Sequence, residues 1–376
     1  MLYLPEEIDR IEDRRTIANI EPILAEARKI LDSSETIARK QREMDRRPGR
    51  RDYSVTSLLL AYLLKEMFKV PYDSARYLMF DSFCEKMGLP RDSAGKWMKP
   101  RGSTICEFKR EILEPMLDEL TEEIVKAMLE RLKVVHRGEG YVVLTLDSTP
   151  AQASRYNFDA EYNGHYRIRM DKMHIIMIDG VPLFMIPTGG NEGDNYPVEE
   201  LLKKTEGTIA KVDLKGLEIK TMADGGYDSF RTFYLFHHHL GVELDCHIRE
   251  TAVFNDEADW DSLVKKYTRM YKCPGFDPHR KTDEAFVLAF LSRNGQEELV
   301  GKYIRNKQLL RQKDHEQHEI KDTDRQVCET MHHSMKAWLD FTTVKLRHKL
   351  RESTLKCRFF LSQLLSVIFK GYVSYD

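Results

Sequence analysis

The sequence predicts an α/β protein: a mixed five-stranded sheet with flanking helices, preceded by an all-α domain and interrupted by an insertion before the last helices. Three observations predict it. Apolar residues recur at helical spacing up to about residue 136, short β-branched runs follow, and long helical patterns return after residue 320. The expected domains are residues 1–136, 137–250 and 321–376, with the insertion at 251–320.

The composition favours a cytoplasmic protein with a substantial core. The chain has 376 residues, 41% of them hydrophobic, and a formal net charge of −2 at pH 7. Its six cysteines form no CxxC pair, its first residues do not resemble a signal peptide, and no apolar run approaches the roughly 18 residues of a membrane span. We therefore expect a cytoplasmic location and no contact with membranes.

Positive charge is concentrated in four stretches, although the whole chain is nearly neutral. Residues 39–51 and 336–358 each hold seven basic and two acidic residues, 91–110 hold six and two, and 301–313 hold five and none. Such stretches are typical of proteins that present a positive face to a polyanion such as DNA. The alternative is that each stretch is the solvated face of one helix.

The first domain is expected to be helical throughout. Its helices are expected at residues 54–68, 71–90 and 102–135. Gly88 and Pro90 are stop signals for the second helix, and Ser103 or Thr104 is the expected cap of the third. A short helix, a turn and a longer helix with basic residues near its start resemble the helix-turn-helix of DNA-binding proteins. A plain helical bundle is the alternative.

At about residue 140 the pattern changes to strands. The expected strands cover residues 141–147, 164–180, 181–188, 217–226 and 242–249. Asp179 and Gly180 predict a hairpin between the second and third strands, and helices are expected within 189–207 and at 227–241. Three strands joined by hairpin-like links, then strand–helix–strand, is the order of an RNase H-like core. In that order the first and fourth strands are neighbours.

Residues 250 to about 320 interrupt this order, and we expect two strands there, at 282–292 and 298–306. Helices are then expected over 322–350 and 353–373. The insertion would separate the sheet from the helices that complete the core.

Two aspartates end neighbouring strands of the expected sheet. Asp147 ends the apolar run "YVVLTLD", and Asp224 ends "LEIKTMAD". Two carboxylates in contact repel each other, and a divalent metal ion removes that cost. Oxygen ligands of this kind suit Mg²⁺, and two such ions about 3.5–4 Å apart would activate a nucleophile and stabilise a leaving oxygen in phosphoryl transfer.

A two-metal site needs a third carboxylate, and the helix expected after residue 321 offers Glu329. Arg325, Glu329 and Lys336 are spaced four and seven residues apart, so they lie on one stripe of a helix. The alternative is an ordinary exposed helix face with an i,i+4 Arg–Glu pair.

Together these residues resemble the DDE transposases of prokaryotic insertion sequences, and in particular the group with a Y-R-E-K signature in its last catalytic region. The resemblance rests on "LTLDSTP", "MADGGYDS" and the R-x3-E-x6-K spacing, with further likeness in residues 162–175 and 190–197. It covers about residues 54 to 370, and the signature's tyrosine falls at Asp322 in this chain.

The resemblance implies an RNase H-like catalytic domain with a metal-binding triad of Asp147, Asp224 and Glu329. Two Mg²⁺ ions, or Mn²⁺ as a substitute, would bind there. Arg325 and Lys336 would contact phosphates of the transposon ends. Lys172 and Arg249 are further candidates for DNA contact, the alternative for each being an ordinary surface charge.

The expected activity is metal-dependent endonuclease cleavage of double-stranded DNA at inverted-repeat ends, followed by strand transfer into target DNA. Both steps are in-line phosphoryl transfers that need no protein nucleophile. A homodimer is expected in the DNA complex, because two ends must be joined, and the protein would be associated with the nucleoid. The alternatives are an inactive or repurposed DNA-binding relative and an RNase H-like nuclease that cuts without joining.

Other polar and aromatic residues have plainer interpretations. The spacing of His237–His239 and the later cysteines fits no zinc template. Asp194 and Glu192 either support the site or form an acidic loop before a helix N-terminus, and the loop is favoured. Trp97 either stacks on a flipped base or packs against the protein, and packing is favoured.

Overall fold

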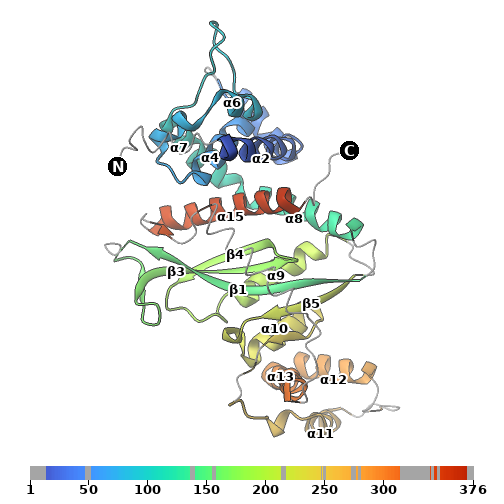
Figure 1. Cartoon of the computed structure of the whole chain (residues 1–376). Coiled ribbons are helices and arrows are strands. Elements are labelled where there is room, and N and C mark those ends of the chain that lie inside the picture. The colour runs from blue at the N-terminus through green and yellow to red at the C-terminus, as the bar shows by residue number, and fades with distance from the viewer. Residues whose placement is uncertain are drawn as a thin grey trace.

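The computed structural model of the chain describes residues 14–46, 52–135, 140–154, 158–212, 217–246, 248, 251–271, 277, 281–313, 339, 343–344 and 348–370. The protein is mixed α/β, as the sequence predicts. A seven-stranded sheet lies between an N-terminal group of helices and a second group, α11–α13 (Figure 1).

The N-terminal helical unit is built around α4, which is buried on nearly every side. It consists of α2 (Arg14–Asp32), α3 (Glu35–Asp45), α4 (Val55–Met67), α5 (Tyr72–Ala75), the 3-10 turn η1 (Arg76–Leu78), α6 (Asp81–Met87), α7 (Gly102–Phe108), the π-helical turn η2 (Lys109–Leu113) and α8 (Glu114–Val135). The run Leu58–Leu60 is fully enclosed, as its apolar sequence predicts. Ser54 caps α4 by accepting a hydrogen bond from the backbone N–H of Ser57.

Three expectations for this unit are wrong. The helix expected at 71–90 is divided into α5, η1 and α6. The helix expected at 102–135 is preceded by Arg101, without a side-chain cap from Ser103 or Thr104. Its π turn lies just before Pro115, which has no N–H and whose ring excludes a regular helical turn. Residues 89–101 form a projecting loop (Figure 1), in place of the roughly three- to four-residue turn of a helix-turn-helix.

The sheet has the neighbour relation that the sequence predicts. Its strands are β1 (Tyr141–Ala153), β2 (Glu161–Asn163), β3 (Ile168–Ile178), β4 (Val181–Gly189), β5 (Glu218–Ala223), β6 (Leu244–Cys246) and β7 (Thr343–Val344). The order is β2-β3-β1-β5-β6, with β4 also paired to β3 and β7 to β1. β3 is antiparallel to β1, β2 and β4, whereas β5 is parallel to β1 and β6. β1 and β5, the first and fourth expected strands, are therefore confirmed as neighbours.

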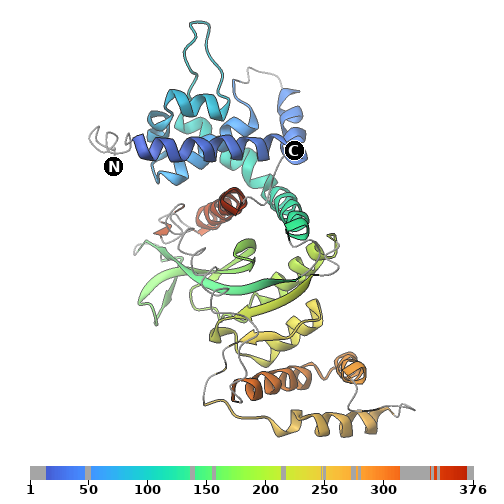
Figure 2. The same ribbon diagram turned by 45° about the vertical axis from the view of Figure 1, so that its right-hand side comes forward.

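Helices enclose the sheet. Met173–Ile178 of β3 are all buried, although alternate residues point to opposite faces, so both faces are covered here. α9 (Val198–Ile209) packs against β4 and against α10 (Phe230–Leu240). α15 (His348–Lys370), expected at 353–373, lies between the N-terminal helices and the sheet, as the turned view also shows (Figure 2). The Gln363 side-chain amide donates to the backbone oxygens of Pro182 and Leu183 in β4.

The insertion is helical, and the two strands expected there are wrong. It contains η4 (Asp256–Ala258), α11 (Trp260–Met270), α12 (Lys281–Arg293) and α13 (Glu297–Lys313). Short apolar runs do not distinguish a strand from a helix, and acidic residues in the first turns of α12 and α13 suit helix N-termini. The helix expected over 322–350 is also wrong at Thr343–Val344, which pair with β1 as β7. Both residues are β-branched, a type that favours strands.

Candidate functional site

The candidate site lies where β1 loses its parallel neighbour. Parallel pairing joins Tyr141–Leu146 of β1 to Glu218–Ala223 of β5 and ends at the pair Leu146 and Ala223. Asp147 and Asp224 are the next residues of the two strands. The expectation that the strand itself ends at Asp147 is wrong, because β1 continues to Ala153 through its antiparallel pairing with β3. Asp147 and Asp224 therefore each follow the last residue of the parallel pairing between β1 and β5.

Both aspartates are oriented by short backbone hydrogen bonds. Asp147 Oδ1 accepts from the backbone N–H of Ser148 at 2.7 Å, and Asp224 Oδ1 accepts from Gly225 at 2.7 Å. Asp224 caps the 3-10 turn η3 (Gly225–Tyr227) in this way. Asp147 is half-buried and Asp224 is exposed. Asp224 is therefore accessible to a polar ligand, and Asp147 is partly accessible.

A third carboxylate, Asp194, belongs to the same cluster. Its Oδ1 lies 3.1 Å from Lys172 Nζ and 3.8 Å from His174 Nδ1. Its other oxygen lies over Gly226, where an added Cβ would stand 2.9 Å from Oδ2. Asp194 therefore packs against the turn that carries Asp224. Of the two interpretations of its sequence position, the contacts favour support of the site.

His174 and Tyr227 form the buried floor of the cluster. His174 Nε2 lies 2.9 Å from the Thr188 hydroxyl, and its Nδ1 lies 3.4 Å from the Tyr227 hydroxyl. Burial lowers the pKa of His174 to about 4, so the imidazole is neutral at pH 7. Burial, followed by the negative charges of Asp194 and Asp147, raises the pKa of Tyr227 well above its ordinary value. Both rings therefore act as neutral hydrogen-bonding groups beneath the carboxylates.

Sequence reasoning missed His174 and Tyr227. His174 stands in the apolar run "MHIIMI", where a polar residue that points into the core requires partners, and that was an available signal. Tyr227 carried no comparable signal. It follows two glycines and contacts His174 only because η3 turns back under β3.

The expected site residues divide into two groups. Asp147, Asp224 and Lys172 lie in the cluster just described. The Lys172 ammonium is mostly buried and bonds Asp194 and the Glu192 carbonyl, so its charge is directed into the protein. The other predicted residues, Glu329, Arg325, Lys336 and Arg249, lie outside the described residues. Among the residues that are described, no three His, Cys, Asp or Glu side chains are grouped so as to hold a metal ion.

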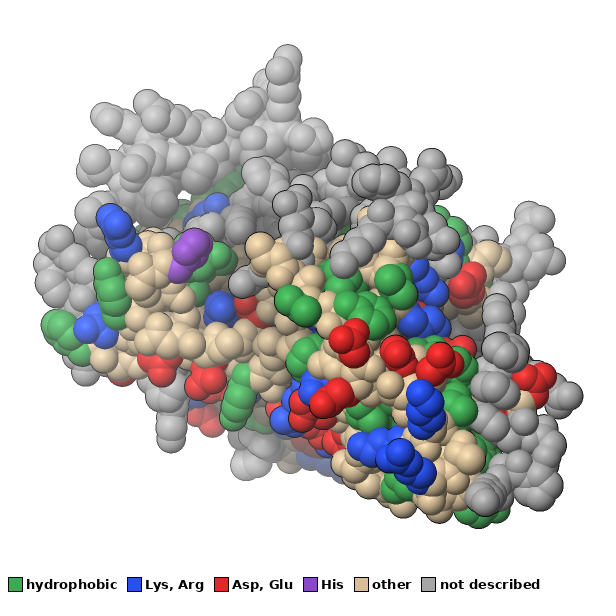
Figure 3. Space-filling view, turned by 90° about the horizontal axis from the view of Figure 1, so that it is seen from below, with side chains coloured by type: hydrophobic (Ala, Val, Ile, Leu, Met, Phe, Trp, Pro, Cys, Tyr) green, Lys and Arg blue, Asp and Glu red, His purple; other side chains and the backbone are tan. Residues whose placement is uncertain are grey.

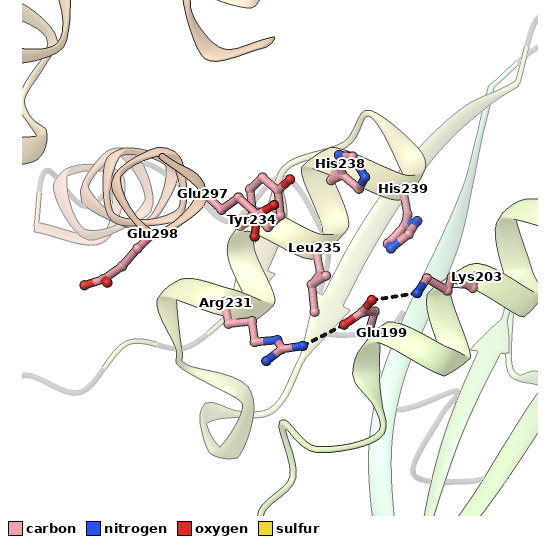
Figure 4. Close-up of a pocket in the computed structure, with 9 residues that line it drawn as sticks. All are labelled: Glu199, Lys203, Arg231, Tyr234, Leu235, His238, His239, Glu297 and Glu298. Carbon is pink, nitrogen blue, oxygen red and sulfur yellow. Dashed lines mark hydrogen bonds and ion pairs between the residues drawn. The ribbon is translucent and has the colours of Figure 1, made fainter. Parts of the chain in front are cut away.

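A second concave site lies between α9, α10 and the start of α13 (Figure 4). Glu199 is its central acid, and it bonds both Lys203 and Arg231 at 2.6 Å. These bonds, that to Lys203 first, lower the pKa of Glu199 to about 2. Because this carboxylate is already neutralised by two cations of the chain, the pocket is a weaker candidate than the aspartates of the sheet edge.

The basic stretch 301–313 forms most of α13, and its charges are largely paired. Lys302 pairs with Glu298, Arg305 with Asp228, and Lys307 and Arg311 with Glu243. Seen from below, where α11–α13 face the viewer, acidic and basic side chains are interspersed (Figure 3). Of the two interpretations of this stretch, these pairs do not favour the one in which it offers positive charge to a polyanion, because carboxylates of α13 itself and of other elements neutralise four of its basic side chains.

Comparison with models of known protein families finds none that matches this chain, and comparison with curated proteins finds no match either. Among the residues that the structure describes, no helix is both long and apolar enough to cross a lipid bilayer.

Proposed function

We propose that the protein is a metal-dependent DNA transposase with an RNase H-like catalytic core. The observation that carries the proposal is that Asp147 and Asp224 each directly follow the last paired residue of two parallel neighbouring strands. The strand order supports it, because an antiparallel β4-β3-β1 arrangement continues into parallel β5 and β6. This is the order from which the sequence predicted two neighbouring carboxylates.

The donor chemistry of the site fits Mg²⁺. Asp147 and Asp224 supply hard carboxylate oxygens at the ends of two parallel strands, and Glu329 would be the third ligand of a pair of Mg²⁺ or Mn²⁺ ions. When bound, such ions lower the pKa of a water molecule and stabilise the charge that develops on the phosphodiester. Without them, the carboxylates of the site would repel both one another and a DNA phosphate.

The remaining residues of the cluster would hold the carboxylates in place. Lys172 neutralises Asp194 from one side, and the neutral His174 and Tyr227 add hydrogen-bonding capacity without a further charge. This arrangement keeps Asp194 out of competition with Asp147 for a cation. Double-stranded DNA would reach the site from the side on which Asp224 is exposed, with Arg325, Lys336 and Arg249 as contacts. Two copies of the chain would join two DNA ends in the nucleoid of the cytoplasm.

The proposal is tested by cleavage and joining of a labelled DNA fragment that carries the inverted repeat flanking the gene. We expect joining in Mg²⁺ or Mn²⁺, none in EDTA, and a loss of at least about a thousandfold in Asp147→Ala. Asp261→Ala is the matched control, since Asp261 is an exposed aspartate in the first turn of α11. It should retain full activity.

The other outcomes separate the alternatives. Metal-dependent cleavage without joining, lost in Asp147→Ala, would identify a nuclease on the same fold. DNA binding with no cleavage by the unmodified protein would contradict the catalytic proposal and leave a DNA-binding relative.

A further inference from the structure

The projecting loop, defined as residues 89–101, joins α6 to α7 at the end of the molecule opposite α11–α13 (Figure 1). It contains four basic residues and one acidic residue. Every residue from Arg91 to Lys96 is exposed, and so is Arg101. Lys96 and Arg101 form no ion pair within the part of the chain that the structure describes. The loop therefore presents positive charge to solvent, whereas α13 does not.

The single acidic side chain of the loop is used inside it. Asp92 Oδ1 accepts hydrogen bonds from the backbone N–H groups of Ala94 and Lys96, each at 2.9 Å. The backbone N–H of Asp92 donates to the Lys96 oxygen at 2.8 Å, and Gly95 supplies the left-handed residue of the turn with a φ of +77°. Asp92 thus fixes the tip through hydrogen bonds to the loop's own backbone. A tip fixed in advance loses less conformational entropy when it binds a partner.

An arginine and a tryptophan brace the two sides of the loop. The Arg91 guanidinium lies 3.9 Å from the centre of the Trp97 ring and donates to the Gly95 oxygen at 2.9 Å. Because Arg91 covers its ring, Trp97 packs against the protein, which the sequence interpretation favoured over stacking on a base.

The root of the loop is anchored in the helical unit. Leu89 and Pro100 are buried on its two sides. Gly102, the first residue of α7, lies against the backbone of Tyr72, and an added Cβ would stand 2.6 Å from the Tyr72 carbonyl oxygen. The loop is therefore a fixed projection on a packed base.

We propose that loop 89–101 enters a groove of duplex DNA and that Lys96 and Arg101 contact the phosphates beside it. The two sides of the loop form an antiparallel bridge between Arg91 and Trp97. A two-stranded ribbon of this kind fits the major groove, which is about 12 Å wide. Lysine and arginine side chains at phosphates displace condensed counterions, which favours binding. The proposal rests on the proposed function for its choice of DNA, and it deepens that function by naming a contact remote from Asp147.

An acidic protein surface is the competing partner. The composition of the loop tip argues against a protein partner, because residues 92–95 (Asp, Ser, Ala and Gly) offer no large apolar side chain. Protein–protein interfaces are enriched at their centres in aromatic residues and methionine. A small polar tip flanked by cations suits the polar and charged groove of DNA better.

The test is binding of the full chain to two fluorescein-labelled 40-base-pair duplexes, one with the flanking inverted repeat and one with its scrambled sequence. Anisotropy is measured over a series of salt concentrations. We expect Lys96→Ala/Arg101→Ala to bind both duplexes about tenfold more weakly and to lower the slope of log Kd against log salt by about two. An unchanged melting temperature would show that the fold is intact.

The control variant is Lys126→Ala/Lys204→Ala, which removes two lysines whose side chains are 56% and 47% exposed on α8 and α9. It should bind as the unmodified protein does. If the loop variant has the same DNA affinity and the same salt slope as the unmodified protein, the loop does not contact DNA and the proposal is overturned. An equal weakening in the control variant would overturn it too, since the effect would then be one of net charge.

Failure of the loop proposal and failure of the proposed function give different results. If the loop variant joins DNA in a metal-dependent reaction and has unchanged DNA affinity, only the loop proposal is overturned. Loop-dependent binding by a protein that never cleaves DNA supports the loop and contradicts the transposase. An unmodified protein that binds neither duplex contradicts both.

Discussion

Two basic stretches that are alike in sequence are opposite in structure. In α13, four basic side chains each contact a carboxylate, and three of the acids, Asp228, Glu243 and Glu284, come from distant positions in the chain. In the projecting loop, Lys96 and Arg101 are exposed, and the only acid, Asp92, is hydrogen-bonded to the loop's own backbone. A count of basic residues therefore does not predict a positive surface. Whether a basic stretch forms a positive surface depends on where the fold places the carboxylates.

The largest expected effect is the loss of stability on removing Arg305, a buried charge of α13. Arg305 makes two hydrogen bonds to Asp228, at 2.5 and 2.8 Å, and both side chains are largely buried. Arg305→Ala should lower the free energy of unfolding by about 3 kcal/mol, because it leaves a buried carboxylate without its partner. Urea denaturation measures the loss. DNA affinity should not change. A stable Arg305→Ala variant with weak DNA binding would contradict the contrast between the paired charges of α13 and the exposed charges of the loop.

A matched variant sharpens this result. Arg305→Ala/Asp228→Ala removes both charges together and should be less destabilised than the sum of the two single variants. Additive losses would mean that the pair is not the source of the stability.

A smaller effect is expected at the sheet edge, where His174 is buried in its neutral form. Its pKa of about 4 lies below the ordinary value of about 6.5, so on acidification the unfolded chain takes up a proton before the folded chain does. Stability should therefore fall as the pH drops from 7 towards 4, by about 2 kcal/mol from this group between pH 7 and pH 5. Denaturation at several pH values measures the slope. His174→Gln should flatten it, and an equal slope in that variant would assign the pH dependence to other groups.

The smallest effect is expected at the outer surface of α13. Lys302 pairs with Glu298 at 2.7 Å, but the glutamate side chain is 73% exposed. Lys302→Ala should cost less than about 0.5 kcal/mol, since water and salt screen such pairs. DNA binding, measured by anisotropy, should be unchanged. A weaker affinity would place α13 in the DNA interface together with the loop and would remove the contrast between them.

The features predicted correctly from the sequence are those decided locally or by chain order. Asp179 and Gly180 form the expected hairpin with φ values of +47° and +73°, because these residue types tolerate the left-handed region. The adjacency of β1 and β5 followed from the order of elements alone. It brought Asp147 and Asp224 together although 76 residues separate them.

The features that the sequence did not predict depend on contacts between segments that are distant in the sequence. The first strand was expected to end at residue 147, yet Pro150 lies within β1 and pairs with Lys172 of β3. β5 has already ended there, so the missing N–H of Pro150 interrupts no bond on that side. The cluster of Asp194, His174 and Tyr227 depends likewise on contacts between the β4–α9 loop, β3 and η3, which no local pattern encodes.

α15 has a consequence for the order of events during synthesis. Arg351 is enclosed at the sheet beside Asp171, Arg358 reaches Glu66 of α4 at 3.0 Å, and Gln363 binds β4. This helix, the last of the described elements, therefore joins the two parts made first. At about 5–20 residues per second, a ribosome needs roughly 8 to 30 seconds to go from the end of β4 to the start of α15. For that interval the apolar surface that α15 will cover is open in the nascent chain, and a chain truncated before α15 would keep it open.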